Sequence, residues 1–356
     1  MAPRERVRTV LLGGHADRVP FTMYECMAPD CPEQREMLER GMCIVDRGVT
    51  VFRTHAPNVK TTSETYEEDG KRLTRTRCET PVGTVTSLHQ SAGFTSWCRE
   101  RMFKSKDDYK VLLFMIRDER YEPCYDVFAR AERERGENVI LRSGFGLEPL
   151  QVLVSGGWMG TERFCIEWMD NRDEVLKLYD AIVENRRKIY PLVAASPALH
   201  ANYGGNVIPE VTGPGMFERY YAPHYNEAAE TMHRHGKLVG CHFDDDCRLL
   251  SAAIAGTGLD YVEAFTPAPD TDMTVAEARA AWPDKVLWLN FPSSVHLAPD
   301  AEVESATVEM LDSLETVDGL IVGITEDMPP HRWKDSCRAI MSGLERHAAE
   351  NPPLYG

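Results

Sequence analysis

From about residue 105 onward, strand-like apolar runs alternate with helical segments, and this alternation limits the folds open to the chain. Strands are expected near 138–143, 198–203, 236–243, 261–265 and 319–324, and helices near 107–135, 172–194, 215–235, 246–256, 274–281, 302–315 and 330–349. Between 174 and 194, apolar residues recur every three or four positions, which is typical of an amphipathic helix. Such alternation indicates parallel βα units. The 356-residue length suits a (β/α)8 TIM barrel, whose range is roughly 200 to over 400 residues. We therefore predict an α/β barrel in a single domain spanning residues 1–356.

Before this region, the turn residues and extended runs are typical of antiparallel strands. An Asp69-Gly70 turn separates two extended runs, and Thr80-Pro81-Val82-Gly83-Thr84 follows as another short strand. We expect residues 60–95 to form an antiparallel β-hairpin insert in the N-terminal part of the barrel.

Charge and cysteine content narrow the partners and the compartment. The net charge of −16, from 40 basic and 56 acidic residues, gives an acidic surface that repels nucleic-acid phosphates and anionic lipid. Ten cysteines are scattered without a repeated spacing, which favours a reducing, cytoplasmic setting over a disulfide framework. No apolar run reaches the length of a membrane span, and the charged start does not read as a signal peptide. We expect no nucleic-acid partner and no membrane partner.

Acidic and imidazole side chains stand at the ends of three later strands. His242 and Asp244 close the 236–243 run, Glu263 lies in the next run, and Glu326 follows the last one. In a parallel barrel the carboxyl ends of the strands meet at one face, so these side chains should converge. Imidazole with carboxylate oxygens suits Zn²⁺ in a catalytic site, and an oxygen-rich set could also accept another divalent ion. We predict a metal site formed by His242, Asp244, Glu263 and Glu326.

Other polar and aromatic side chains follow predicted strands and are candidates to line the pocket. The expected substrate-binding residues are Tyr24, Glu25, Arg142, Asn202 and Tyr203. Aromatic faces with one cation would suit a small aromatic or zwitterionic substrate. His296 also follows a strand and is a candidate catalytic acid or base, together with Glu326. Cys241 should point away from His242 by strand alternation and pack as a buried thiol.

Short motifs along the whole chain carry a family resemblance. They are Arg4-Glu5-Arg6-Val7 with Ala16-Asp17-Arg18-Val19-Pro20, the Thr80–Thr84 strand, the Gly236-Lys237 entry to the His242 strand, and the glycine-containing final strand. In their order and spacing, the chain resembles the uroporphyrinogen decarboxylase superfamily of (β/α)8 barrels, which includes corrinoid-dependent methyltransferases. The decarboxylases carry an arginine-rich element after the opening motif. This chain instead has Phe21-Thr22-Met23-Tyr24-Glu25-Cys26-Met27, which argues against porphyrinogen as substrate.

In the methyltransferase members, the matching strand carries His-x-Cys, followed by an acidic residue and then by a cysteine from the final strand, and together they bind zinc. The resemblance implies that His242 keeps its role and that Asp244 stands at the first cysteine position. Glu263 takes the acidic position, and Glu326 stands at the last cysteine. Carboxylates make the ion a harder Lewis acid, better matched to an oxygen or nitrogen leaving group than to a thiol.

The resemblance therefore implies a zinc-type methyltransferase, acting as a demethylase on a small methoxylated or methylamine-type compound. The methyl acceptor would be cobalamin carried by a separate corrinoid protein, because the chain has no Asp-x-His-x-x-Gly cobalamin motif. Barrels of this family often pair, so a homodimer is a further expectation. Two alternatives stay open. One is a metal-free decarboxylase or lyase in which Arg142 holds the carboxylate of a small acid, and the other is a non-catalytic corrinoid-protein partner.

Overall fold

Nine strands form the central sheet of this protein, whose computed structural model describes residues 1–92 and 95–355. In sheet order they are β10 (Ser143–Gly146), β11 (His200–Tyr203), β12 (Leu238–His242), β13 (Tyr261–Phe265), β14 (Val286–Asn290), β15 (Leu320–Ile324), β1 (Phe21–Tyr24), β2 (Met42–Asp46) and β9 (Val139–Leu141). From β11 round to β9, each neighbouring pair is parallel. This is the α/β class and the parallel arrangement that the alternation predicts.

The sheet curls into a nearly closed barrel. Its two edges are β9 and β10, and these strands are separated in the chain by Arg142 alone. If β9 and β10 count as one position, the nine strands fill eight positions in chain order, as in a TIM barrel. The break places Arg142 at the seam.

Alternate strand residues point into the barrel and form layers. The rings of His200 on β11 and Trp288 on β14 are 6.0 Å apart, although two strands separate them in the sheet, so the contact crosses the interior. Trp288 also donates from Nε1 to Thr22 Oγ1 at 2.9 Å. Gly240 on β12 leaves room for the Tyr261 ring, since a Cβ there would lie 2.1 Å from a ring carbon. This aromatic layer fills the barrel beneath the next inward layer, two residues further along each strand.

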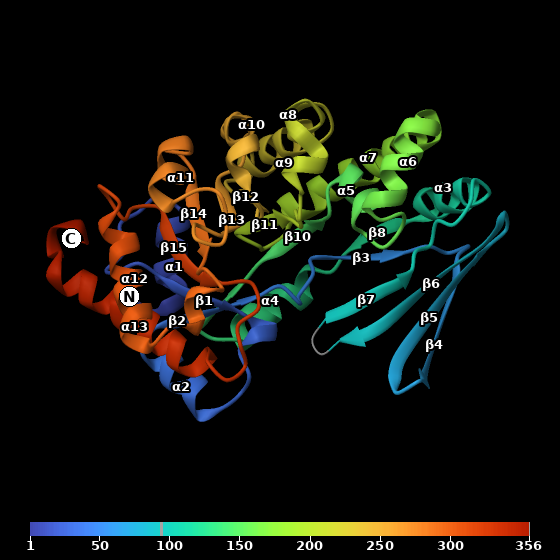
Figure 1. Ribbon diagram of the computed structural model, residues 1–356. Coiled ribbons are helices and arrows are strands. Elements are labelled where there is room, and N and C mark those ends of the chain that lie inside the picture. The colour runs from blue at the N-terminus through green and yellow to red at the C-terminus, as the bar shows by residue number, and fades with distance from the viewer. Residues whose placement is uncertain (93–94, 356) are drawn as a thin grey trace. The chain divides into compact units, whose positions relative to one another are not determined.

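Helices flank the strands on the outside (Figure 1). They are α1 (Pro3–Leu11), α2 (Pro32–Glu39), α4 (Tyr125–Glu134), α8 (Pro209–Tyr220), α9 (Ala222–His233), α10 (Ser251–Ala255), α11 (Val275–Ala281), α12 (Asp300–Asp312) and α13 (Trp333–Glu350), with short 3-10 turns η1 (Glu25–Met27), η2 (Cys247–Leu250), η3 (Val295–Leu297) and η4 (Pro352–Leu354). On α9, which packs on β12, Tyr225, Ala228, Ala229 and Met232 are buried, at the spacing of one helix face. Cys241 points to this side, with Sγ 3.5 Å from the Tyr225 hydroxyl.

The chain separates into two compact units, and the barrel strands β1, β2, β9 and β11–β15 belong to the first. That unit comprises residues 1–51, 125–144 and 197–356, and the second comprises 52–124 and 145–196. The second unit contains β3 (Phe52–His55), β4 (Lys60–Glu68), β5 (Lys71–Thr80), β6 (Gly83–Ala92), β7 (Thr95–Glu100), β8 (Arg120–Pro123), α3 (Asp108–Asp118), α5 (Pro149–Val154), α6 (Thr161–Asp170) and α7 (Arg172–Ala195). The expectation of a single domain over 1–356 stays a prediction.

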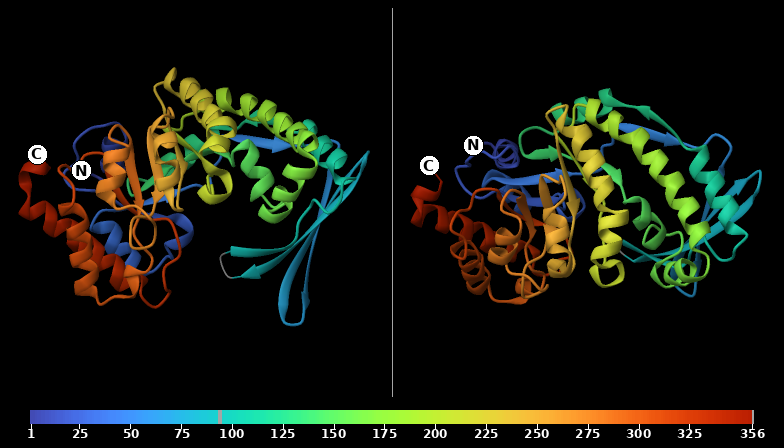
Figure 2. Two further views of the ribbon diagram at one scale, coloured as in Figure 1. Left: turned by 45° about the horizontal axis from the view of Figure 1, so that its top comes forward. Right: turned by 90° about the horizontal axis from the view of Figure 1, so that it is seen from above.

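Within the second unit, β4 to β7 form a four-stranded antiparallel sheet of their own (Figure 2). Asp69 and Gly70 join β4 to β5 with φ of 50° and 69°, the positive values of a type I′ hairpin turn. The antiparallel region therefore extends to Glu100 and holds more than the hairpin expected over 60–95. Residues 93 and 94 of that range lie outside the described residues.

Three further features bear on the sequence expectations. The helix expected over 107–135 is two helices, α3 and α4, because β8 lies between them and pairs with β3. No disulfide bond joins any of the ten cysteines, all of which are among the described residues. Among residues 1–92 and 95–355, no helix combines the length and apolar character needed to cross a membrane.

Candidate metal centre at the mouth of the barrel

Three candidate ligands meet at the carboxyl ends of β12 and β15. The Nε2 atom of His242 lies 3.5 Å from Asp244 Oδ2 and 3.3 Å from Glu326 Oε1. One ligand atom from each residue lies within 4.8 Å of the others. The strands are three positions apart in the sheet, so Glu326 reaches the other two across the mouth.

The spacing of these atoms fits a small divalent ion. A tetrahedral ion with bonds of about 2.0–2.2 Å keeps its ligand atoms about 3.3–3.6 Å apart. Both distances from His242 Nε2 fall near this range. The exposed fraction of the side chain rises from 11% for His242 to 22% for Asp244 and 39% for Glu326, so the cluster opens outward. An imidazole with two carboxylates is a donor set that suits Zn²⁺ and also harder divalent ions.

Asn290, the last residue of β14, fixes the backbone that carries Glu326. Its Oδ1 accepts hydrogen bonds from the backbone N–H of Thr325 at 3.0 Å and of Glu326 at 3.2 Å. Its Nδ2 donates to Thr266 Oγ1 at 3.2 Å. The amide therefore links the ends of three strands, and its role could not be read from the sequence because nothing there distinguishes it from a capping asparagine.

Glu263 lies behind the imidazole and is fully buried. Its Oε2 is 3.0 Å from His242 Nδ1 and accepts from Asn202 Nδ2 at 2.9 Å. Its Oε1 accepts from the Tyr24 hydroxyl and from Arg142 Nη1. Four polar groups therefore surround one carboxylate, and they come from β1, the β9–β10 seam, β11 and β12.

Electrostatics keep this inner group ionised. Burial alone would raise the pKa of Glu263, but the Arg142 charge and the hydrogen bond to His242 outweigh it, so the pKa lies below its usual range. Burial would lower the pKa of Arg142, but the Glu263 charge outweighs it and the net shift is upward. Burial and the neighbouring Glu263 charge raise the pKa of Tyr24 to about 12, so Tyr24 donates as a neutral phenol.

Three carboxylates, those of Asp244, Glu263 and Glu326, surround the ring of His242. Burial would lower its pKa, but Tyr24 and the three surrounding carboxylates outweigh burial, and the pKa is raised well above its usual value. Below the cluster, burial and the Arg142 charge lower the pKa of His200 to about 3. Neither ring nitrogen of His200 has a hydrogen-bond partner among the described residues. His200 is therefore a neutral packing residue under a charged layer.

Two backbone features place the site residues. Ala264 has φ of 61°, which is rare for a residue with a side chain, and the β13–β14 register shifts there as in a β-bulge. The bulge follows Glu263 directly and sets the direction of its side chain. Gly205 (φ +68°) packs against the next strand, since a Cβ there would lie 1.7 Å from the His242 carbonyl oxygen.

The structure brings together most of the residues singled out from the sequence, but not all in the expected roles. Tyr24, Arg142 and Asn202 contact Glu263 instead of lining an open pocket. Glu263 was expected as a metal ligand, yet it lies on the Nδ1 side of His242, away from the Asp244 and Glu326 side.

Three other expected residues lie elsewhere. Tyr203 is fully buried with its ring 5.4 Å from Tyr225 of α9, so it points outside the barrel, opposite to Asn202. His296 is buried on η3, and its Nδ1 lies 2.6 Å from Ser336 Oγ on α13. Glu25 pairs with Arg47 at 3.1 Å. Each of the three contacts a residue outside the cluster of His242, Asp244 and Glu326.

Arg47 is a residue that the sequence interpretation missed. Its guanidinium carbon stacks 3.5 Å from the centre of the Tyr24 ring, and its side chain is 30% exposed. It follows β2 directly, so the rule applied to other strand ends would have found it. The stack covers the outer face of Tyr24 with a cation.

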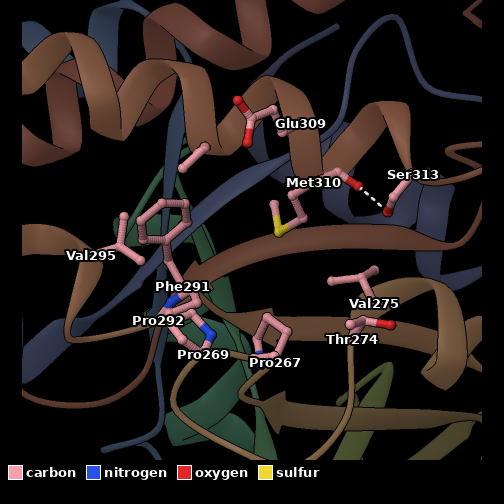
Figure 3. Close-up of a pocket in the computed structure, with 12 residues that line it drawn as sticks. Pro267, Pro269, Thr274, Val275, Phe291, Pro292, Val295, Glu309, Met310 and Ser313 are labelled. Carbon is pink, nitrogen blue, oxygen red and sulfur yellow. Dashed lines mark hydrogen bonds between the residues drawn. The ribbon is translucent and has the colours of Figure 1, made fainter.

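A separate cavity of about 360 Å³ opens between α11 and α12 and the loops after β13 and β14 (Figure 3). Its lining is mainly apolar, with Pro267, Phe291 and Met310 among its walls and Glu309 as its one carboxylate. No residue of the metal cluster lines it. The candidate centre therefore rests on the convergence of ligand atoms and not on this cavity.

Comparisons with known proteins do not name a family. No protein-family model matches the chain, and no curated protein matches it. The solved structures that match it include two of the pneumococcal exo-β-D-N-acetylglucosaminidase StrH. One, from work on N-glycan recognition and hydrolysis, is 9% identical and the match covers 97% of this chain and 87% of that chain, with a TM-score of 0.38. The other, of its tandem GH20 catalytic modules, is 8% identical and the match covers 95% and 87%, with a TM-score of 0.38.

Proposed function

We propose that this chain is a divalent-metal-dependent methyltransferase. It removes a methyl group from a small methoxylated or methylamine-type compound and passes it to cobalamin on a separate corrinoid protein. The sequence resemblance supports the choice of methyl transfer, and the ligand chemistry supports an oxygen or nitrogen leaving group. The separate corrinoid protein, the cytoplasmic setting and a homodimer belong to the same proposal.

The observation that carries the proposal is the convergence of His242 Nε2, Asp244 and Glu326 at the mouth of the barrel. These residues would hold the ion. When bound, a divalent ion supplies Lewis acidity that stabilises negative charge developing on a leaving oxygen or nitrogen. Two carboxylates without thiolates favour this use over activation of a thiol acceptor.

The chain's own residues provide the setting for this chemistry. Asn290 holds the backbone of Glu326, and Glu263 holds the ring of His242. Glu326 is the most exposed of the three ligands, so it is also the candidate acid or base for the departing group. The Arg47–Tyr24 stack forms part of the same rim.

The decarboxylase or lyase alternative is less well supported. It assigns Arg142 to a substrate carboxylate, but Nη1 of Arg142 already contacts Glu263 and Tyr24. The Arg142 side chain is 10% exposed. A substrate acid would have to compete with a fully buried carboxylate for this guanidinium, so we do not favour this reaction.

A reconstituted methyl-transfer assay tests the proposal. The chain is purified without chelators and loaded with Zn²⁺, Co²⁺ or Mn²⁺, and free cob(I)alamin is the acceptor for a panel of methoxylated aromatics and methylamines. Formation of methylcobalamin, followed by its absorbance, should require both the ion and His242. The variants are His242→Ala and Glu326→Gln, and the exposed Glu218→Gln on α8 is the matched control for loss of a carboxylate.

Methyl transfer at an equal rate in the metal-free protein or in His242→Ala would contradict the metal-dependent assignment. No methylcobalamin formation from any compound of the panel, with an ion bound, would contradict the enzyme assignment. It would favour the non-catalytic corrinoid-protein partner.

A further inference from the structure

The carboxylate of Glu263 has no lone pair left for an ion. A carboxylate has about four acceptor sites on its two oxygens. In Glu263, Oε1 faces the Tyr24 hydroxyl and Arg142 Nη1, and Oε2 faces Asn202 Nδ2 and His242 Nδ1. Arg142 Nη1 and Asn202 Nδ2 can only donate, and the Tyr24 hydroxyl donates as a neutral phenol. These three groups therefore occupy three of the acceptor sites of Glu263.

The same contacts fix the proton on His242. Glu263 is ionised beside Arg142 and can only accept. The Tyr24 hydroxyl also lies 3.3 Å from Nδ1, but its one hydrogen goes to Glu263 Oε1. The Nδ1 atom, 3.0 Å from Oε2, therefore carries a hydrogen of its own. In the neutral ring that binds an ion, the lone pair therefore lies on Nε2. That atom faces Asp244 and Glu326, on the side open to solvent.

The backbone also holds Glu263 in this direction. Ala264 is fully buried with φ of 61°, and a non-glycine residue adopts this conformation only where the surroundings impose it. The accompanying bulge offsets β13 against β14 at the residue after Glu263. Bulges beside a site commonly re-aim a side chain.

We infer that Glu263 is a positioning residue and not a metal ligand: paired with Arg142, it holds His242 as the Nδ1–H tautomer so that Nε2 serves the ion. The inference rests on the proposed metal site and deepens it, because it assigns the expected fourth ligand a different role. Carboxylates that orient a metal-binding histidine in this way typically change metal affinity by 10–100-fold when they are removed.

The test compares Glu263→Gln with wild type by three measurements. Zn²⁺ affinity is measured by competition with a chromophoric chelator, the Co²⁺ absorption spectrum reports the ligand set, and nitrogen NMR of histidine-labelled protein reports which ring nitrogen carries hydrogen or metal. We expect about 10–100-fold weaker Zn²⁺ binding in Glu263→Gln with an unchanged Co²⁺ ligand set. In the Zn²⁺-loaded wild type, His242 should carry hydrogen on Nδ1 and the ion on Nε2.

Two further variants control for misfolding and for the loss of a carboxylate in general. Glu263→Gln can misfold because it leaves Arg142 without its carboxylate, so the double variant Arg142→Met with Glu263→Gln removes both charges and should show the same weakening. Glu218→Gln, which removes an exposed carboxylate from α8, should retain wild-type affinity.

A Co²⁺ spectrum that loses a ligand in Glu263→Gln, or Zn²⁺ bound through Nδ1 in wild type, would overturn the inference. If wild type binds no ion, the proposed function fails, and NMR of the metal-free protein still decides the inference when it is recorded at a pH high enough to make the His242 ring neutral. Hydrogen on Nδ1 alone would support it, and hydrogen on Nε2 alone would contradict it.

Discussion

Nδ1 of His242 lies 3.0 Å from Oε2 of Glu263, so the imidazole is bound from behind by a carboxylate that solvent does not reach. The opposite nitrogen of the same ring faces two more exposed carboxylates. One histidine thus joins an inner, closed charge network to an outer, open cluster.

Removal of Arg142 should strongly destabilise the fold. Arg142→Met leaves the fully buried Glu263 charge without its cation, and breaking a buried pair in this way costs about 3–5 kcal/mol. Urea unfolding followed by circular dichroism gives the free energy of unfolding. Adding Glu263→Gln should restore part of the loss, and a double variant no more stable than Arg142→Met would show that the pair is not the cause.

Gly205 should tolerate no side chain. Gly205→Ala combines left-handed strain with a Cβ placed on the His242 carbonyl oxygen, whereas Gly236→Ala has the same φ of +68° with open space. We expect about 1–2 kcal/mol of strain in Gly236→Ala, and a further 1–3 kcal/mol of overpacking in Gly205→Ala. Denaturant unfolding of both variants separates the two contributions, and equal losses would argue against the close approach.

His200 should make the protein less stable in acid. Burial and Arg142 lower its pKa to about 3, while in the unfolded chain it titrates near its ordinary value of 6.5. Below pH 6.5 the unfolded state therefore binds a proton at His200 that the folded state does not bind. The free energy of unfolding falls as the pH is lowered from 6.5 towards 3.

His200→Phe should remove this contribution without loss at pH 7.5, because both ring nitrogens lack partners among the described residues. Its unfolding free energy relative to wild type should rise by about 1 kcal/mol or more between pH 7.5 and pH 5. Comparing the two proteins cancels the opposite effect of His242, whose raised pKa is shared by both. Parallel pH profiles would contradict the assignment.

Metal should stabilise the folded state through His242. An ion at 100 times its dissociation constant adds about 2.7 kcal/mol to the free energy of unfolding if it binds only the folded chain. Thermal unfolding with increasing Zn²⁺ should show this rise in wild type and in Glu218→Gln, and none in His242→Ala. A rise that persists in His242→Ala would place the ion elsewhere.

The sequence predicted the barrel better than it predicted contacts within the barrel. Apolar runs and amphipathic helices depend on local spacing, so β12, β13, β15 and α7 lie where the patterns place them. The helix expected over 107–135 was wrong because β8 pairs with β3, which is distant in the sequence, although Pro123 was a local warning.

The sequence predicted which strand ends form the candidate site, but it did not predict the hydrogen bonds and ion pairs among their side chains. The rule that strand ends converge found His242, Asp244 and Glu326, whose side chains do meet. It misjudged His296, whose ring turns to Ser336, because loop direction is set by packing against α13. The role of Glu263 depends on the bulge at Ala264 and on donors from other strands, which no local pattern reveals.

The most direct measurement is a crystal structure of the Zn²⁺-soaked protein with anomalous diffraction data collected on both sides of the zinc edge. We predict one strong anomalous peak about 2.0–2.2 Å from His242 Nε2 and from oxygens of Asp244 and Glu326, with Glu263 outside bonding distance. A peak bound to other residues, or no peak at this cluster at saturating Zn²⁺, would contradict the metal centre.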